Sequence, residues 1–337
     1  MPAFVFFPPT ASSFKNNFER GALYGYGHWQ PVEPLLFIAG LSYDWLKYPQ
    51  NFRAPPLAGG ESHKERLSPK VGIIWTPARN TTVRSAYAES LGGVSFDQSF
   101  QLEPSQIAGF QQTFRSLIPE SVSGAISAQR YKTAGVALDQ KLPTRTYLGI
   151  SAEWNRADAK QTVGAYDFVF PNPATLSSVG EQLAFEEKAL RLTLNQLLSD
   201  EWSLGAQYRL SHADLEDTFP GIPATVPATG GFLRHQHVKA TLQQLNLFAL
   251  YNHPSGFFGQ AQGVWNAQDN SGYSPAEPGD EFWQCHVFAG YRFWRRHAEV
   301  SVGVLNLTDR DYHLNPLTLY SELPRRRTAV VSLKFNF

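Results

Sequence analysis

Apolar and polar side chains alternate one by one over long stretches of this sequence. From Trp202 to Leu210, every second residue is apolar, and the residues between them are small or polar. The same period of two recurs at 146–154, 283–293 and 329–337. Strict alternation places each set on one face of a β-strand, whereas a helix would scatter these residues around its circumference. The pattern predicts an all-β protein.

The alternation predicts thirteen strands. One segment, 181–198, has some helical character, but the spacing of Leu190, Leu192 and Leu194 favours a strand. The expected strands cover approximately 18–29, 33–47, 65–76, 80–90, 124–139, 144–156, 181–197, 201–213, 236–251, 255–268, 282–294, 297–308 and 324–337.

Short and long connections alternate between these strands. The short ones are expected at 30–32, 77–79, 141–143, 199–200, 252–254 and 295–296. The long ones are expected at 48–64, 91–123, 157–180, 214–235, 269–281 and 309–323. Nothing in the architecture of soluble sandwiches and propellers requires short and long connections to alternate. Outer-membrane barrels combine short periplasmic turns with long extracellular loops, so we predict a transmembrane antiparallel β-barrel.

The tryptophans support this prediction, because indole rings favour the boundary between membrane and water. Four are expected beside short turns and four at strand ends that face long loops, which would form two girdles. The first group is Trp29, Trp75, Trp202 and Trp294, and the second is Trp45, Trp154, Trp265 and Trp283.

Composition excludes several classes of protein. The charged fraction of 17% is below the roughly 25% of soluble domains, while aromatic residues make up 14%. Because 29 basic residues balance 29 acidic ones, no surplus of charge suggests a nucleic-acid partner. The only cysteine, Cys285, excludes an internal disulfide and a multi-cysteine metal site. No apolar run reaches the ~18 residues of a membrane helix.

Candidate chemistry is sparse. His235 and His237 share a strand face, but a solvated strand start explains them better than a metal site does. Asp309 and Asp311 are expected to form a turn. The basic run 325–327 is expected at a strand end, against anionic headgroups or a neighbouring carboxylate. With no nucleophile elbow and no phosphate loop, we predict no catalytic residues, no metal, no cofactor and no enzymatic activity.

Residues 303–337 resemble the last two strands of TonB-dependent outer-membrane receptors. The segments 67–77 and 80–91 are similar to a recurring hairpin of that family, and 99–121 resembles the subset fused to tetratricopeptide repeats. The residues expected to form the terminal motif and assembly signal are Asn306, Leu307, Thr308, Asp309, Tyr312, Arg327, Phe335 and Phe337.

The resemblance implies a barrel of about twenty-two strands around an N-terminal plug, of which about thirteen or fourteen strands are expected here, without the plug. We therefore expect an irregular N-terminal segment at 1–17 and a partial outer-membrane barrel at 18–337. Since thirteen antiparallel strands begin and end in the same direction, an open sheet with a free edge near 18–29 is expected.

The resemblance also implies a function and partners in the bacterial outer membrane. The leading expectation is active uptake of a scarce ligand of the siderophore, cobalamin, glycan or metal chelate class. The alternatives are a passive porin-like channel and a non-functional fragment of a truncated receptor. Expected partners are outer-membrane lipid and lipopolysaccharide, the outer-membrane assembly machinery, a small extracellular ligand, and the TonB complex if a plug is present. The ligand-binding residues are unknown at this point, because specificity resides in loops and plug.

Overall fold

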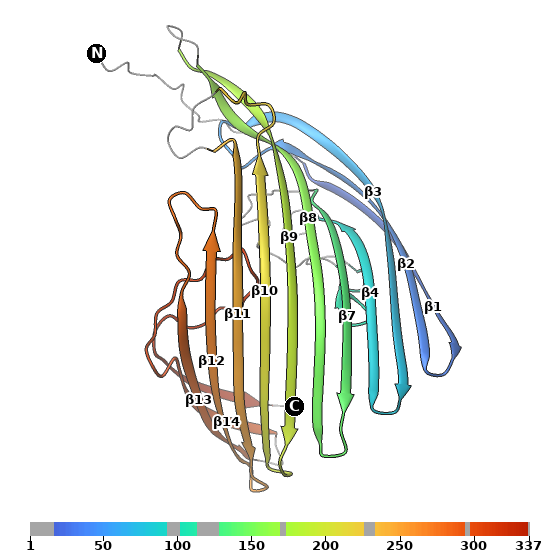
Figure 1. Ribbon diagram of the computed structural model, residues 1–337, viewed down its shortest axis with the longest axis vertical. Helices are drawn as coiled ribbons and strands as arrows, with labels where there is room; N and C mark the ends of the chain where they lie inside the picture. Colours follow the sequence, from blue (N-terminus) through green and yellow to red (C-terminus); the bar gives the residue numbers. More distant parts are fainter. Residues whose placement is uncertain are drawn as a thin grey trace.

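A strongly curved antiparallel sheet of thirteen strands dominates the computed structural model (Figure 1). The structure describes residues 17–92, 102–112, 128–168, 173–225, 233–293 and 297–335. Within these residues no helix is long and apolar enough to cross a bilayer.

All thirteen expected strands are present, and each pairs with its neighbour in the sheet along the chain order. They are β1 (Glu19–Val32), β2 (Leu35–Asn51), β3 (Ala58–Ala78), β4 (Thr81–Leu91), β7 (Arg130–Lys141), β8 (Thr146–Asp167), β9 (Thr175–Leu197), β10 (Trp202–Thr218), β11 (His235–Asn252), β12 (Phe257–Ser271), β13 (Glu281–Phe293), β14 (Ala298–Leu305) and β15 (Thr328–Phe335). The expected all-β antiparallel fold is confirmed.

The two outer strands of the sheet, β1 and β15, each pair on one side only within the described part of the chain. The order of strands is therefore linear, as expected for an open sheet with an edge at β1. The sheet still curves strongly, so that β13 and β14 lie behind the plane of β8–β11 (Figure 1).

Several strands are longer than expected, and two predicted long loops are wrong. β8 runs to Asp167 and β9 starts at Thr175, so strand replaces most of the loop predicted at 157–180. β2 and β3 likewise reduce the loop predicted at 48–64 to residues 52–57. At the other long connections the strands end at the same edge of the sheet, opposite the short turns (Figure 1).

These strands are longer than predicted because their apolar residues change from one face of the sheet to the other partway along the strand. In β9, Leu190, Leu192 and Leu194 are exposed on the outer face, whereas Leu183 and Phe185 are buried on the inner face. The phase of the alternation therefore shifts between 185 and 190. This shift also explains the helical character noted at 181–198. Apolar residues two positions apart are separated there by one step of five, from 185 to 190, so the segment does not show a pure period of two.

The same reversal divides β10 into two parts. From Trp202 to Leu210 the outer face is apolar, but His212 and Asp214 continue that face with polar groups. On the inner face, Ala213 and Leu215 are buried. We call the apolar outer zone the outer belt, and the strand portions beyond it toward the long loops the upper part.

Two segments cover the inner face. The inner hairpin, residues 102–112 with β5 (Gln106–Ile107) and β6 (Phe110–Gln111), packs against β3, β4 and β7. The C-terminal strap, residues 306–327, covers the inner face farther along the sheet, where fully buried Leu317 joins Leu183 and Phe185 in one hydrophobic cluster. Both segments come from connections that were predicted to be long.

Candidate functional site

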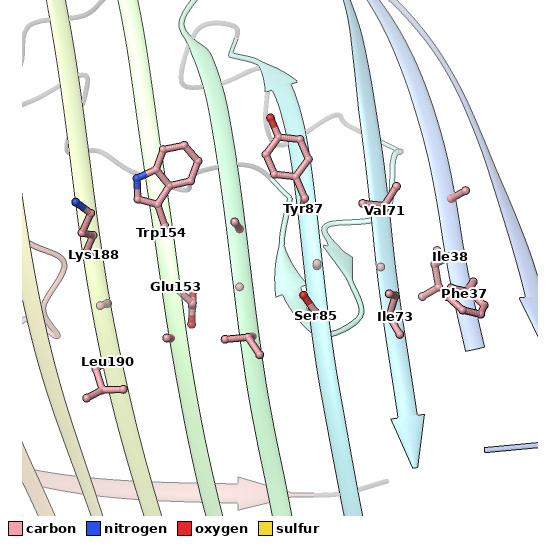
Figure 2. Close-up of a pocket in the computed structure, with 18 of the residues that line it drawn as sticks. Phe37, Ile38, Val71, Ile73, Ser85, Tyr87, Glu153, Trp154, Lys188 and Leu190 are labelled. Carbon is pink, nitrogen blue, oxygen red and sulfur yellow. The ribbon is translucent and has the colours of Figure 1, made fainter. Parts of the chain in front are cut away.

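The outer belt is a continuous apolar surface. Successive partners across four strands, Leu148, Leu194, Ala206 and Leu247, all lie on this face. Leu194, Leu204 and Val302 expose 42%, 40% and 55% of their surface. A shallow depression of about 1260 Å³ crosses the belt, and Figure 2 shows Phe37, Ile73 and Leu190 among its lining residues. An apolar surface of this extent on a sheet fits contact with lipid chains.

Seven of the eight tryptophans lie in the described residues, and the strand register places all seven on the outer face. Toward the short turns, Trp29 stacks on Phe37 at 5.4 Å, and Trp202 lies 4.7 Å from Tyr251 between ring centroids. Toward the long loops, Trp265 and Trp283 face each other across β12 and β13.

The other three tryptophans follow the same division. Trp75 lies near the β3–β4 turn, whereas Trp45 and Trp154 lie toward the long-loop end. Figure 2 shows Trp154 near Lys188, with which it pairs in register. Trp294 falls outside the described residues. The role of these rings at the membrane boundary stays a prediction.

The inner face beside the belt carries many polar side chains. The register places the following residues on it: Arg191, Thr193, Asn195, Gln207, Arg209, Gln260, Gln262, Glu299, Ser301 and Lys334. Hydrogen bonds link some of them across strands, such as the one that Gln262 Nε2 donates to Asn246 Oδ1 at 3.0 Å. A polar inner wall opposite an apolar outer belt can line a water-filled passage.

The inner hairpin narrows this passage and is held by a buried ion pair. The fully buried ammonium of Lys70 on β3 binds the carboxylate of Glu103. Tyr26 of β1 donates to the same carboxylate at 2.5 Å and lies 2.8 Å from Gln112 Oε1. On the sheet side, Gly135 has no side chain where the Phe110 ring approaches, and a Cβ there would overlap the ring. Sequence reasoning missed this hairpin, because its strands have only two residues each.

The family motif organises the start of the C-terminal strap. Asn306, which is fully buried with φ +50°, follows β14 directly. Its Nδ2 donates to the carbonyls of Arg310 at 2.9 Å and Pro324 at 3.1 Å, and its Oδ1 accepts from the Arg310 N–H at 2.9 Å. Its own N–H donates to His286 Nδ1. The side chain of Asn306 therefore joins both ends of the strap, and its backbone N–H connects them to β13.

Other motif residues continue this anchoring. Asp309 Oδ1 accepts from the Arg327 N–H at 2.7 Å. Tyr312 is buried, stacks on Phe282 at 5.0 Å and donates its hydroxyl proton to the Leu323 carbonyl. These contacts hold the first and last residues of the strap together.

The remaining motif residues lie around this turn or on β15. Leu307 is exposed, and the Thr308 hydroxyl lies 3.4 Å from Asn306 Oδ1. Phe335 faces outward on β15, opposite Ala298. Phe337 lies outside the described residues. Their role as an assembly signal remains a prediction.

Arg325 of the basic run and the two histidines have carboxylate partners. Arg325 lies 3.5 Å from Asp311. His237 Nε2 lies 2.6 Å from Asp214, and His235 lies 3.1 Å from Glu216, on the outer face of the upper part. No group of three metal-ligating side chains comes together within the described ranges.

A buried acidic pair was not found from the sequence. Glu181 and Asp217 are hydrogen-bonded on the inner face of the upper part. Burial, followed by the charge of Glu181, raises the pKa of Asp217 from 3.8 to about 7, and burial also raises the pKa of Glu181. The pair therefore retains a proton near neutral pH. The residues are 36 positions apart, and only the β9–β10 register brings them together.

This pair predicts a pH dependence of stability. Because the pKa of Asp217 is higher in the folded than in the unfolded chain, the folded state binds the additional proton. The free energy of unfolding should then fall as the pH rises from about 4 to about 7. Asp217→Asn should reduce this fall, since it removes the contribution of Asp217 and its amide can donate to Glu181 at any pH. Thermal unfolding of the purified chain between pH 4 and 8 checks this, and equal slopes for both proteins would contradict it.

Comparison with known proteins agrees with this architecture. A sequence profile described as TonB dependent receptor-like, beta-barrel, matches residues 2–123. The FrpB iron transporter from Neisseria meningitidis covers 95% of this chain at 13% identity, with a TM-score of 0.59. The copper transporter OprC covers 95% at 14% identity, with a TM-score of 0.52. The chain has the fold of a TonB-dependent receptor barrel.

The resemblance found in the sequence is thereby confirmed at the level of fold, and the tetratricopeptide subtype stays a prediction. A TonB-dependent receptor barrel is an outer-membrane fold, so the chain is an outer-membrane protein by fold. It spans 46% of the FrpB structure and 48% of the OprC structure. No curated protein matches the sequence. The described residues include no plug domain inside the sheet.

Proposed function

We propose that this chain forms part of the wall of an outer-membrane barrel that takes up a small extracellular ligand. The observation that carries the proposal is the division of the sheet into an apolar outer belt and a polar inner wall partly covered by two inward-folded segments. A wall of this kind separates lipid from a passage that segments of the same chain constrict.

The long-loop end of the sheet is the extracellular end in this proposal. The upper part beyond the belt carries charged pairs on its outer face, such as His237 with Asp214, as expected for strands that extend into water. There an apolar cluster on the inner face packs beneath the C-terminal strap. The strap is thus fixed to the wall above the polar passage.

Metal chelates are the ligand class that we favour. FrpB, an iron transporter, and OprC, a copper transporter, share the fold. Siderophores belong to the same class, whereas cobalamin and glycans have no comparable support. Lipid, lipopolysaccharide, the assembly machinery and, where a plug is present, the TonB complex are the proposed partners.

The proposal predicts accumulation of metal by cells that produce the chain. In an iron-limited Gram-negative host without its own metal-chelate receptors, the full chain should raise cell-associated iron or copper severalfold over an empty vector, measured by mass spectrometry. The control is Leu192→Arg, which places a charge in the outer belt. Equal metal contents in all three strains would contradict the uptake of metal chelates.

A further inference from the structure

Two arginines occupy directly opposite positions on the inner wall. Arg191 of β9 pairs in register with Arg209 of β10, and both side chains lie on the polar inner face. Like charges directly opposite each other destabilise an antiparallel pair unless something compensates them. The compensation present in the chain is incomplete.

Only part of the Arg209 guanidinium has a partner. Its Nη2 donates to Glu187 Oε1 at 3.0 Å, and that carboxylate is fully buried and also accepts from the Ser211 hydroxyl. The Nε of Arg209 has no hydrogen-bond partner among the described residues. The ion pair thus neutralises one charge of the two.

Arg191 has no ion-pair or hydrogen-bond partner within the described part of the chain, and its Nε is buried without an acceptor. Buried polar groups are normally satisfied, so the buried, unpaired Nε of this partly exposed side chain points to an acceptor that the chain itself does not supply. A guanidinium presents a planar fork of donors that matches carboxylate and phosphate groups.

A cavity of about 390 Å³ opens beside Arg191 on the inner wall toward the short turns. Arg79, Arg84 and Lys141 line it together with Arg191, against a single carboxylate, Asp139, which Arg84 binds at 2.8 Å. The volume lies in the usual range of small-molecule sites. The excess of cations in a partly enclosed space favours an anionic occupant.

We propose that Arg191 and the cavity beside it form a subsite for a small oxyanion, with carboxylate or phosphate groups, on the inner wall of the passage. Arg191 supplies the unpaired fork, and Arg79 and Lys141, which line the same cavity, supply further positive charge. The inference deepens the proposed function by giving the cargo a chemical class, and only its role in uptake rests on that function.

Binding to the purified full chain in detergent tests the subsite without any transport. Citrate and inorganic phosphate serve as probes in isothermal titration, and glycerol serves as an uncharged comparator. Wild type should bind citrate or phosphate and not glycerol, and the two anions show whether carboxylate or phosphate is preferred. Arg191→Gln should weaken the preferred anion at least tenfold, which corresponds to about 1.4 kcal/mol.

The matched control is Lys334→Gln, which removes one positive charge from the inner wall on β15, away from the cavity. Its affinity should stay within twofold of wild type. Arg191→Gln should unfold at the same temperature as wild type or higher without anion, because no partner is lost. Arg191→Lys keeps the charge without the fork and should show an intermediate affinity, which provides a second test if Arg191→Gln does not fold.

Three results would overturn the subsite: no anion binding by wild type, equal affinities of wild type and Arg191→Gln, or an equal loss in Lys334→Gln. None of these results depends on metal accumulation by cells. A failed accumulation experiment therefore refutes the uptake proposal and leaves the binding measurement valid.

Discussion

Leu192→Arg is expected to prevent most of the chain from assembling in the membrane. Leu192 lies in the middle of the outer belt, between its register partners Ile150 and Tyr208, and exposes 37% of its surface. A lipid-facing arginine near the bilayer midplane costs about 2–4 kcal/mol. The membrane-embedded fraction of the full chain, measured by resistance to urea extraction from isolated membranes, should fall severalfold.

The matched control introduces the same side chain on the other face. Gln260 lies on the inner wall of β12, where water can solvate an arginine. Gln260→Arg should assemble as wild type does, with a change within about 0.5 kcal/mol. Equal losses in both variants would show that the two faces of the sheet are assigned incorrectly.

Asn306→Ala is expected to detach the C-terminal strap from the sheet. The substitution removes three hydrogen bonds of 2.9–3.1 Å and leaves the Arg310 N–H without its acceptor, while the carbonyls of Arg310 and Pro324 keep only the bonds from Gln284 Nε2. A typical hydrogen bond of this kind contributes about 0.5–1.5 kcal/mol. Alanine also tolerates the positive φ of this position less well than asparagine does.

Limited proteolysis of the membrane-embedded chain measures this effect. Cleavage within 306–327 should become at least tenfold faster in Asn306→Ala, while the rest of the sheet resists the protease. The control is Leu307→Ala at the neighbouring exposed position, which should leave the cleavage rate unchanged. Unchanged cleavage in Asn306→Ala would mean that the motif does not hold the strap.

Much of the fold could be predicted because the outer belt imposes an alternation that local sequence shows directly. Leu190, Leu192 and Leu194 identified both the strand and its apolar face. The motif at Asn306 was also visible, and the structure gives it a physical role at the turn after β14. Such features depend on neighbouring residues in the chain.

Features that depend on register could not be predicted in this way. The extension of β9 to Thr175 was missed because Leu183 and Phe185 face inward under the strap, out of phase with the belt. The inner hairpin depends on the distant pair of Lys70 and Glu103. The opposed arginines and the acidic pair of the upper part likewise arise only once β9 and β10 are aligned.

The number of strands limits what can lie beside the two free edges. With thirteen antiparallel strands, β1 and β15 run in the same direction across the membrane. Two copies inserted with the same orientation would therefore bring only parallel edges together, whichever edges met. Antiparallel closure instead requires an odd number of further strands, the first and last of which both run from the short-turn end to the long-loop end. This holds whether residues of the same polypeptide or of another one provide them, and it makes the total even, as in bacterial single-chain barrels.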